Sequence, residues 1–237
     1  MKTIGLIGGM SWESSLEYYR IINEGVKQKL GGLHSAKCIM VSVDFAEIEE
    51  LQRQGNWREA AARMTGAAQS LEKAGADFFV ICTNTMHKLA GEIRSGVNIP
   101  LLHIVDAAAK SVKAANMRTV GLLGTRYTME EDFHIRRFTE KHGLKILIPD
   151  GEDRGKINEI IFHELCLGVV RPESREYYLS VIDKLVQRGA QGVILGCTEI
   201  EMLVRPEDTS TRLFPTTKIH ASAAVEYAVE GASDLVE

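Results

Sequence analysis

Short apolar runs alternate along the chain with longer amphipathic segments. The short runs predict strands, because they are apolar throughout and mostly bounded by Gly, Asn, Asp or Pro, as strands buried on both faces are. The longer segments repeat apolar residues every three or four positions, as in residues 57–74, where Lys73 and Gly75 mark a helix end. The expected strands are 3–7, 38–43, 78–82, 101–103, 119–123, 144–148, 192–195 and 213–214. This alternation predicts an α/β fold with parallel sheets.

The two halves of the sequence resemble each other. Residues 71–85 align without a gap with residues 185–199, and each stretch reads as a helix end, a Gly-Ala turn, an apolar strand and a small polar cluster. Residues 4–8 match residues 120–124 at nearly the same offset. A repeat of this kind predicts two copies of one structural unit. We expect two similar Rossmann-like or flavodoxin-like domains with parallel sheets, related by a pseudo-twofold axis and with the active site in the cleft.

The domain boundaries follow from the repeat. The last helical pattern, residues 219–235, comes after the second half is complete, and we expect it to pack back on the first half. The N-terminal domain is therefore predicted as residues 1–103 plus 212–237, and the C-terminal domain as residues 104–211.

Candidate chemistry lies where strands end, because ligands of parallel α/β sheets bind beyond the carboxyl ends of strands. The repeat aligns Thr83 with Cys197, and Cys82 with Gly196. Side chains alternate between the two faces of a strand, so Cys82 is expected to be packed while Thr83 and Cys197 face the cleft. Cys197 is also expected to open a helix, whose first turn favours a thiolate.

Two loops add polar groups to these strand ends. A glycine turn, Gly8-Gly9-Met10-Ser11, follows the first strand, and Thr125 begins its counterpart in the second half. Loops rich in N–H and hydroxyl donors suit a small anion such as a carboxylate. Neither loop has the spacing of a nucleotide-binding motif. Residue-type statistics predict solvated surface positions for four further polar residues, which are Gln52, Arg53, His87 and Lys156.

Composition excludes several classes of function. The 237 residues include 28 Lys and Arg against 32 Asp and Glu, a formal net charge of -4, and only 6% are aromatic. This balance argues against a nucleic-acid partner or an anionic membrane surface. There is no long uncharged apolar run that would predict a membrane span. The four cysteines lack Cys-x-x-Cys spacing, which argues against a zinc site. The apolar stretch near the N-terminus is too short for a signal peptide, so we expect free thiols and a cytoplasmic location.

Four motifs together resemble those of the aspartate/glutamate racemase family of cofactor-independent amino-acid racemases. They are Gly8-Gly9-Met10-Ser11-Trp12, Asn84-Thr85, Leu123-Gly124-Thr125 and Gly196-Cys197-Thr198-Glu199, and the resemblance runs nearly end to end. It implies two α/β domains with the active site between them and a cysteine from each domain on opposite faces of the substrate α-carbon. One thiolate removes the α-proton and the other thiol returns one from the far side. The resemblance implies no pyridoxal phosphate, no metal and a homodimer.

The sequence departs from the family pattern at the first cysteine. The family has Cys-Asn-Thr, whereas this chain has Thr83-Asn84-Thr85, with Cys82 one residue too early. The resemblance implies that the second-half cysteine faces the α-hydrogen of the L-enantiomer. On that basis we expect Cys197 to deprotonate L-aspartate or L-glutamate, and Thr83, or a water it holds, to supply the proton on the other face. An alcohol ionises less readily than a thiol, so a bias towards L-substrates is predicted. Pro215 stands where relatives often have Asp, and nothing in the sequence explains this change.

The resemblance also implies a set of substrate-binding residues and leaves the substrate open between aspartate, glutamate and another amino acid. The implied set is Met10, Gln52, Asn84, Thr85, Thr125, Lys156, Thr198 and Glu199. Lys156 would balance the substrate side-chain carboxylate. Three alternatives stay open. One is a decarboxylase resembling arylmalonate decarboxylase, with a single cysteine, another is a hydantoin racemase-like or maleate isomerase-like enzyme, and the third is a non-catalytic protein that binds an acidic amino acid.

Overall fold

The computed structural model describes residues 1–231 and divides the chain into two compact units. Unit 1 comprises Met1–Ile104 and the described residues from His220 onward, and unit 2 comprises Val105–Ile219. Residues 212–219, predicted in the N-terminal domain, lie instead in unit 2, because the strand that they contain pairs with another strand of that unit. The predicted helix and domain also include residues 232–237, which lie outside the described residues.

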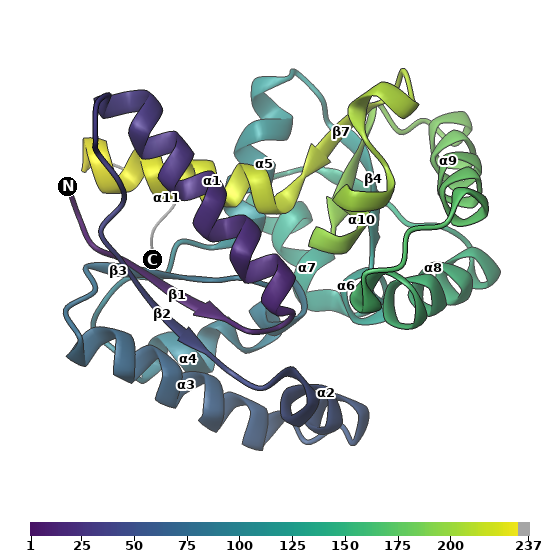
Figure 1. Cartoon of the computed structure of the whole chain (residues 1–237). Helices are drawn as coiled ribbons and strands as arrows, with labels where there is room; N and C mark the ends of the chain where they lie inside the picture. Colours follow the sequence, from purple (N-terminus) through teal and green to yellow (C-terminus); the bar gives the residue numbers. More distant parts are fainter. Residues whose placement is uncertain (232–237) are drawn as a thin grey trace. The chain divides into compact units, whose positions relative to one another are not determined.

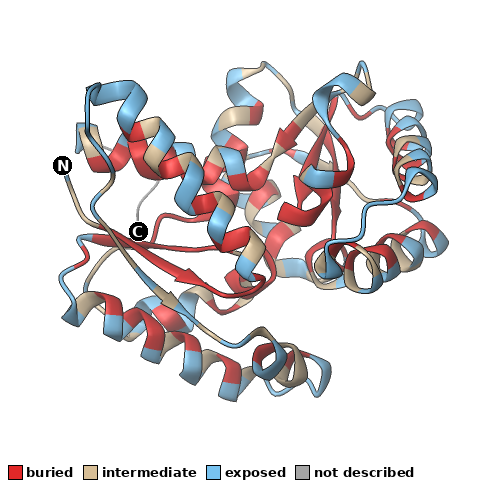
Figure 2. Cartoon of the chain, viewed as in Figure 1, coloured by how far each residue is buried: buried red, intermediate tan, exposed pale blue. Residues whose placement is uncertain are grey.

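Unit 1 is built on a parallel sheet in the order β2-β1-β3 (Figure 1). Its strands are β1 (Ile4–Gly8), β2 (Cys38–Ser42) and β3 (Phe78–Ile81). The predicted strand 101–103 is reduced to a parallel bridge between Leu101 and Phe79, so it continues the sheet beyond β3. β1 and β3 are buried along their whole length, as their uninterrupted apolar sequences predict (Figure 2).

Unit 2 is built on a parallel sheet in the order β5-β4-β6-β7. Its strands are β4 (Thr119–Gly124), β5 (Lys145–Leu147), β6 (Gly192–Gly196) and β7 (Arg212–Pro215). The order matches that of unit 1 when β4, β5, β6 and β7 are placed on β1, β2, β3 and the bridge at Leu101. The predicted α/β fold with two parallel sheets is therefore confirmed, and the sequence repeat corresponds to a repeat in topology.

Helices cover the faces of each sheet. In unit 1, α3 packs against all three strands and α1 packs on β1, with Val225 of α11 against Gly25 of α1. In unit 2, α8 and α9 pack on β4 (Figure 1). Within residues 1–231, none of the helices combines the length and apolar character needed to cross a membrane. The α-helices are α1 (Trp12–Leu30), α2 (Phe45–Arg53), α3 (Trp57–Lys73), α4 (Ala90–Ser95), α5 (Ile104–Ala114), α6 (Arg126–Glu130), α7 (Asp132–Arg136), α8 (Gly151–His163), α9 (Pro172–Gln187), α10 (Thr198–Leu203) and α11 (Thr216–Glu230). Shorter helical turns are η1 (Thr85–Leu89), η2 (Arg137–Lys141), η3 (Leu165–Leu167) and η4 (Pro206–Asp208).

The two units also share the turn that precedes an interior strand. At the end of α3, the N–H of Ala76 donates to the carbonyl of Leu71 at 3.0 Å, around Gly75 at φ +91°. The end of α9 closes in the same way around Gly189, at φ +98°. Positive φ favours glycine, and this bond pattern ends a helix by satisfying its last carbonyls. The Gly-Ala turn found in the sequence thus ends α3 and α9 in the same way, and β3 and β6 begin at the same distance after it.

Candidate functional site

The end of β3 in unit 1 carries a group of polar residues. Cys82 is the last residue bonded to β1, and its N–H donates to the carbonyl of Ile7 at 2.9 Å. Thr83 follows and is half-buried, while Asn84 and Thr85 are buried. Burial raises the pKa of the Cys82 thiol, and Cys82 is fully buried. The expectation that Cys82 is packed is therefore confirmed.

The glycine turn lies beside this group, after β1. Gly9 has φ +92°, and a Cβ there would come within 2.1 Å of the carbonyl oxygen of Val43, so only glycine fits. Ser15 accepts the N–H of Gly9 at 2.7 Å, and Ser11 caps α1 by accepting the N–H of Ser14 at 3.3 Å. β1 and β3 are adjacent and parallel, so Met10 and Thr83 leave the sheet at the same edge.

Gln52 is buried, whereas its polar sequence context predicted a solvated position. It is on α2, and its Nε2 donates to the sulfur of Met86 at 3.2 Å. Met10, Met86 and Ile48 belong to one apolar cluster of unit 1. The structure therefore places Gln52 against Met86, which follows the Thr83 group directly in the chain and belongs to the same apolar cluster as Met10.

Cys197 occupies the equivalent place at the end of β6 in unit 2. Gly124 and Gly196 are paired at the ends of β4 and β6, so the next residues along each strand are Thr125 and Cys197. A Cβ on Gly196 would lie 2.9 Å from the carbonyl oxygen of Leu123. Thr83 and Cys197 therefore have the same register in their own units, as the sequence repeat predicted.

The surroundings of the Cys197 thiol hold it in the protonated form. Its Sγ donates to Oε2 of Glu199 at 2.8 Å. Burial and the negative charge of Glu199 raise the pKa of the Cys197 thiol well above its ordinary value, and Cys166 adds to the increase. The expectation that the start of α10 favours a thiolate is wrong here, because burial and the Glu199 carboxylate outweigh the helix dipole.

The residues that follow β7 make hydrogen bonds with the end of β6 and with α10, next to Cys197. The hydroxyls of Thr198 and Thr217 are hydrogen-bonded at 2.8 Å, and Oε1 of Glu201 accepts the N–H of Thr217 at 3.1 Å. The hydroxyl of Thr216 donates to the carbonyl of Leu195 at 2.8 Å. These contacts lock the start of α11 to the end of β6. The sequence pattern missed Glu201, Thr216 and Thr217. The available signal was the position of Thr216 and Thr217 directly after a strand, and that of Glu201 one helical turn after Cys197.

Thr125 and Lys156 have different settings in unit 2. Thr125 is buried at the start of α6 and caps it by accepting the N–H of Thr128 at 3.3 Å. Lys156 is on α8, where its side chain is half-exposed and pairs with Glu159 at 3.1 Å. The α8 residues that bond to the α6 segment are Arg154 and Asn158, which are one turn apart. Lys156 lies between them in sequence and therefore on a different side of the helix.

His87 is buried, and not solvated as its sequence context suggested. Its Nδ1 lies 2.8 Å from the carbonyl oxygen of Thr83, and its Nε2 lies 3.2 Å from the backbone nitrogen of Ile104. The side chain thus fills the space behind the Thr83 group. The spacing of four residues from Thr83 is one helical turn, which was the signal in the sequence.

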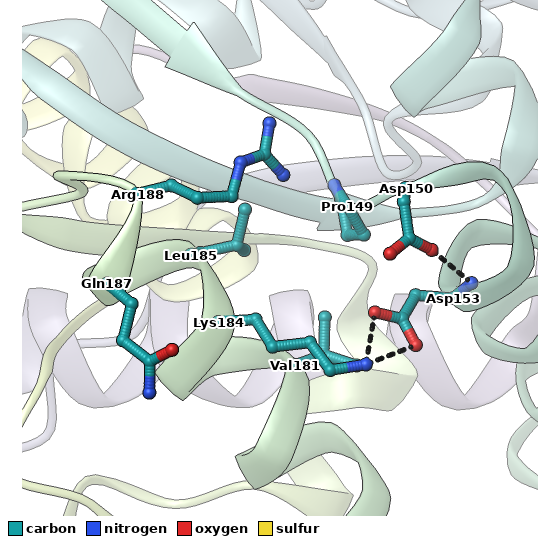
Figure 3. A pocket seen from close by; sticks show the side chains of 8 residues that line it. All are labelled: Pro149, Asp150, Asp153, Val181, Lys184, Leu185, Gln187 and Arg188. Atoms are coloured by element: carbon teal, nitrogen blue, oxygen red, sulfur yellow. Dashed lines mark hydrogen bonds and ion pairs between the residues drawn. The ribbon is translucent and has the colours of Figure 1, made fainter.

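A cavity of about 280 Å³ lies elsewhere in unit 2 (Figure 3). Its charged groups are engaged with the protein itself. Lys184 pairs with Asp153 at 2.8 Å, Asp150 accepts the N–H of Asp153 at 3.0 Å, and Arg188 donates to the carbonyl of Ile148 at 2.7 Å. None of the residues lining it belongs to the predicted site. We therefore assign the candidate site to the strand ends and not to this cavity.

Comparisons with known proteins point to a single family. The model of the Asp/Glu/Hydantoin racemase family matches residues 7–224. A protein from Yersinia pestis, provisionally assigned as an Asp/Glu racemase, has a crystal structure with a TM-score of 0.91, 55% identity, and coverage of 97% of this chain and 100% of that chain. An aspartate racemase homologue from Pyrococcus horikoshii OT3 gives a TM-score of 0.84 and 34% identity, covering 96% and 99%. A broad specificity amino-acid racemase from Bacillus subtilis is 24% identical over 140 residues, which is 58% of either chain.

Proposed function

Because this chain belongs to the Asp/Glu/hydantoin racemase family, we propose that it racemises acidic amino acids without a cofactor, with Cys197 and Thr83 acting on opposite faces of the substrate α-carbon. The observation that carries this proposal is the shared register of the two residues. Thr83 follows Cys82, whose N–H still bonds to β1, and Cys197 follows Gly196, the last residue of β6. The two residues therefore have equivalent positions in a repeated parallel sheet. A reaction that needs two opposed proton-transfer groups suits a repeated unit that presents one group from each copy.

The first proton transfer is assigned to Cys197. The thiol already donates to Glu199 at 2.8 Å, so that carboxylate can accept the thiol proton and leave a thiolate. The thiolate then takes the α-proton of the L-substrate, forming an S–H bond while the C–H electron pair stays on carbon. The raised pKa of the thiol makes the thiolate scarce at neutral pH but also more basic once it forms.

The second proton transfer is assigned to Thr83. Its hydroxyl, directly or through a water it holds, gives a proton to the opposite face of the carbanion. Solvent then restores the hydroxyl proton and takes up the proton left on Glu199. An alcohol is a much weaker acid than a thiol, so its alkoxide is a far less available base for removing the α-proton of the D-substrate. We therefore propose an enzyme that is slow and biased towards L-enantiomers.

The carbanion needs a carboxylate held by fixed donors, because charge then develops in a preorganised field. The proposed binding groups are the buried polar residues at the strand ends. They are Met10 through its backbone, with Gln52, Asn84, Thr85, Thr125 and Thr198. Glu199 is better placed as the partner of Cys197 than as a ligand of the substrate, because its carboxylate faces the sulfur. Lys156 remains proposed as a counter-charge on the resemblance alone.

The test is proton NMR of L-glutamate and L-aspartate with the protein in D₂O, beside a Cys197→Ser variant. We expect the α-proton signal to decay with the wild type and to decay about 10²-fold or more slowly with the variant, since a positioned base contributes at least this much. Chiral chromatography of the same samples should show the D-enantiomer appearing only with the wild type.

Three results would contradict the proposal. If neither L-glutamate nor L-aspartate exchanged its α-proton, acidic amino acids would be excluded as substrates. Parallel assays with hydantoins and malonates would then identify another reaction. Unchanged exchange after replacing Cys197 would remove this residue from the mechanism. Tight binding without exchange, unaffected by the replacement, would favour a binding protein.

A further inference from the structure

Three histidines are buried together in unit 1, behind Thr83. His87, His103 and His220 are each at most 4% exposed. The ring centroids of His87 and His103 are 4.6 Å apart, and those of His87 and His220 are 5.8 Å apart. Hydrogen bonds made by His87 and His220 connect the Thr83 turn to the rest of the unit.

The contacts of His87 determine its tautomer. A carbonyl oxygen can only accept, so the Nδ1 facing the Thr83 oxygen at 2.8 Å must carry a hydrogen. A backbone N–H can only donate, so Nε2 must accept from Ile104 at 3.2 Å. His87 is therefore neutral with its proton on Nδ1, and its ring joins Thr83 to the first residue of α5.

The carbonyl of Thr83 accepts a hydrogen bond from this ring because the backbone of the turn does not use it. In an α-helix the carbonyl of one residue accepts the N–H four residues later. Here the N–H of His87 donates instead to the carbonyl of Asn84 at 3.1 Å. The imidazole takes the place of that backbone donor at Thr83. The orientation of the Thr83 peptide thus depends on a side chain and not on helix geometry.

The segment that His87 holds is itself fixed. The N–H of Leu102 donates to the carbonyl of Phe79 at 3.0 Å. The carbonyl of Leu102 accepts from Nε2 of His220 at 2.8 Å, and Nδ1 of His220 lies 2.8 Å from the hydroxyl oxygen of Tyr18. Ile104 is two residues further on. His87 therefore ties Thr83 to a segment anchored to β3 and α1.

Unit 2 uses the equivalent position in a related way. Glu201 follows Cys197 by four residues, as His87 follows Thr83, and it accepts the N–H of Thr217 at the start of α11. The carbonyl of Cys197, however, accepts a backbone donor, the N–H of Ile200 at 3.2 Å. Both units thus tie the strand-end turn to the next helix start, and only in unit 1 does the same side chain also hold the carbonyl of the reacting residue.

We propose that His87 is a positioning residue for Thr83, which aims the Thr83 hydroxyl for proton return by donating a hydrogen bond from Nδ1 to the Thr83 carbonyl oxygen. This inference rests on the proposed function, in which Cys197 serves one face of the substrate and Thr83 the other. It predicts that damage at His87 impairs inversion selectively. Removal of the α-proton from L-glutamate by Cys197 should continue, together with return of deuterium to the same face.

Two variants test the two hydrogen bonds of the His87 ring one at a time. His87→Asn places an amide N–H near the position of Nδ1, so it keeps the donor to Thr83 and loses the acceptor for Ile104. His87→Gln places its carbonyl oxygen near the position of Nε2, so it keeps the acceptor and loses the donor. His103→Asn is the control, because it removes a neighbouring buried ring that makes neither of these two bonds.

The measurement is the ratio of D-glutamate formation to α-hydrogen exchange from L-glutamate in D₂O, on purified full-length protein. We expect His87→Gln to lower this ratio about fivefold, which corresponds to one net hydrogen bond. His87→Asn and His103→Asn should stay within about twofold of the wild type. Exchange by Cys197 in the same sample reports that the variant is folded and binds substrate.

An equal ratio in all four proteins, or an equal decrease in both His87 variants or in the His103 control, would overturn the positioning role. If the wild type exchanges no α-hydrogen, the proposed function has failed, and the tautomer then tests the bond separately. Long-range ¹H–¹⁵N NMR should show the His87 proton on Nδ1, and a proton on Nε2 would contradict the inference.

Discussion

The ends of β3 and β6 have the same backbone frame and opposite electrostatic character. Thr83 and Cys197 occupy one register, follow matched Gly-Ala turns and precede a short helical turn tied to the next helix. Around Thr83 the tying group is a neutral imidazole. Around Cys197 the thiol faces the carboxylate of Glu199, and Glu201 ties the turn. The comparison shows that the frame is independent of the reacting group it presents, so the two groups can be changed separately.

Replacing Thr83 by Cys gives the largest expected change, because it makes the two ends chemically alike. We expect D-glutamate turnover to rise by roughly 10²-fold, since a thiol is a far better base than an alcohol. L-glutamate turnover should change much less. Initial rates in both directions, followed by chiral chromatography, measure the effect, with Cys82→Ala as the control for a nearby buried thiol. Equal rates before and after the change would contradict the role of Thr83.

The residues just before Thr83 and Cys197, which are Cys82 and Gly196, extend the comparison. Unit 1 has room for a side chain at this position, and unit 2 does not. A Cβ on Gly196 would lie 2.9 Å from the backbone oxygen of Leu123, so β4 and β6 must shift. We expect Gly196→Ala to lower the free energy of unfolding by about 1–3 kcal/mol. Urea titration followed by circular dichroism measures it. A loss below about 0.5 kcal/mol would show that the paired strand ends are looser than the structure indicates.

Neutralising Glu199 tests the electrostatic difference. A carboxylate beside a thiol disfavours the thiolate and raises the pKa of the thiol, so Glu199→Gln should lower the pKa of Cys197. The thiol then ionises at lower pH. The rate of alkylation of the Cys197 peptide by iodoacetamide, followed by mass spectrometry against pH, measures the shift. Glu201→Gln is the matched control, because Glu201 bonds a backbone N–H. An unchanged or higher midpoint would exclude Glu199 as the cause.

Lys156→Ala gives the smallest expected effect on stability. Its side chain is about half-exposed and pairs with Glu159 within one helix, so the free energy of unfolding should change by less than about 0.5 kcal/mol. If Lys156 balances the substrate side chain, KM for L-aspartate should rise more than KM for a neutral amino acid. Steady-state kinetics with both substrates decide this, and an equal change in the two KM values would remove the role.

Much of the fold could be predicted from the sequence, because its signals are periodic. β1, β3 and β6 are short apolar runs that end in glycine or small residues, and the turns at Gly75 and Gly189 require positive φ. Their equal spacing in the two halves predicted the register of Thr83 and Cys197. The boundary of the second unit was not predictable in the same way. Residues 212–219 join unit 2 through pairing of β7 with β6, a contact for which the two-residue run 213–214 gave little signal.

The chemistry around the strand ends was less predictable, because it depends on single side chains that follow no period. His87 and Gln52 are polar residues in polar stretches, and only the folded chain shows that hydrogen bonds to Thr83 and Met86 offset their burial. Glu199 was assigned to substrate binding, and its distance from the sulfur of Cys197 changes the expected charge of that thiol. Sequence spacing gives the backbone position of such groups but not the direction of their side chains.

The chain passes from unit 1 into unit 2 and then back into unit 1, and this affects the order in which the units can be completed. Unit 2 is one continuous segment, whereas unit 1 needs α11, whose Tyr227 ring packs edge-on against Phe78 and whose Ala228 carbonyl accepts the N–H of Lys2 at 2.8 Å. Unit 1 can therefore be completed only after the whole of unit 2 has been synthesised. Until α11 has been made, the strands of unit 1 keep part of their apolar surface uncovered. The bond from His220 to Leu102, which anchors the segment next to the Thr83 turn, cannot form before residues 105–219 have been made.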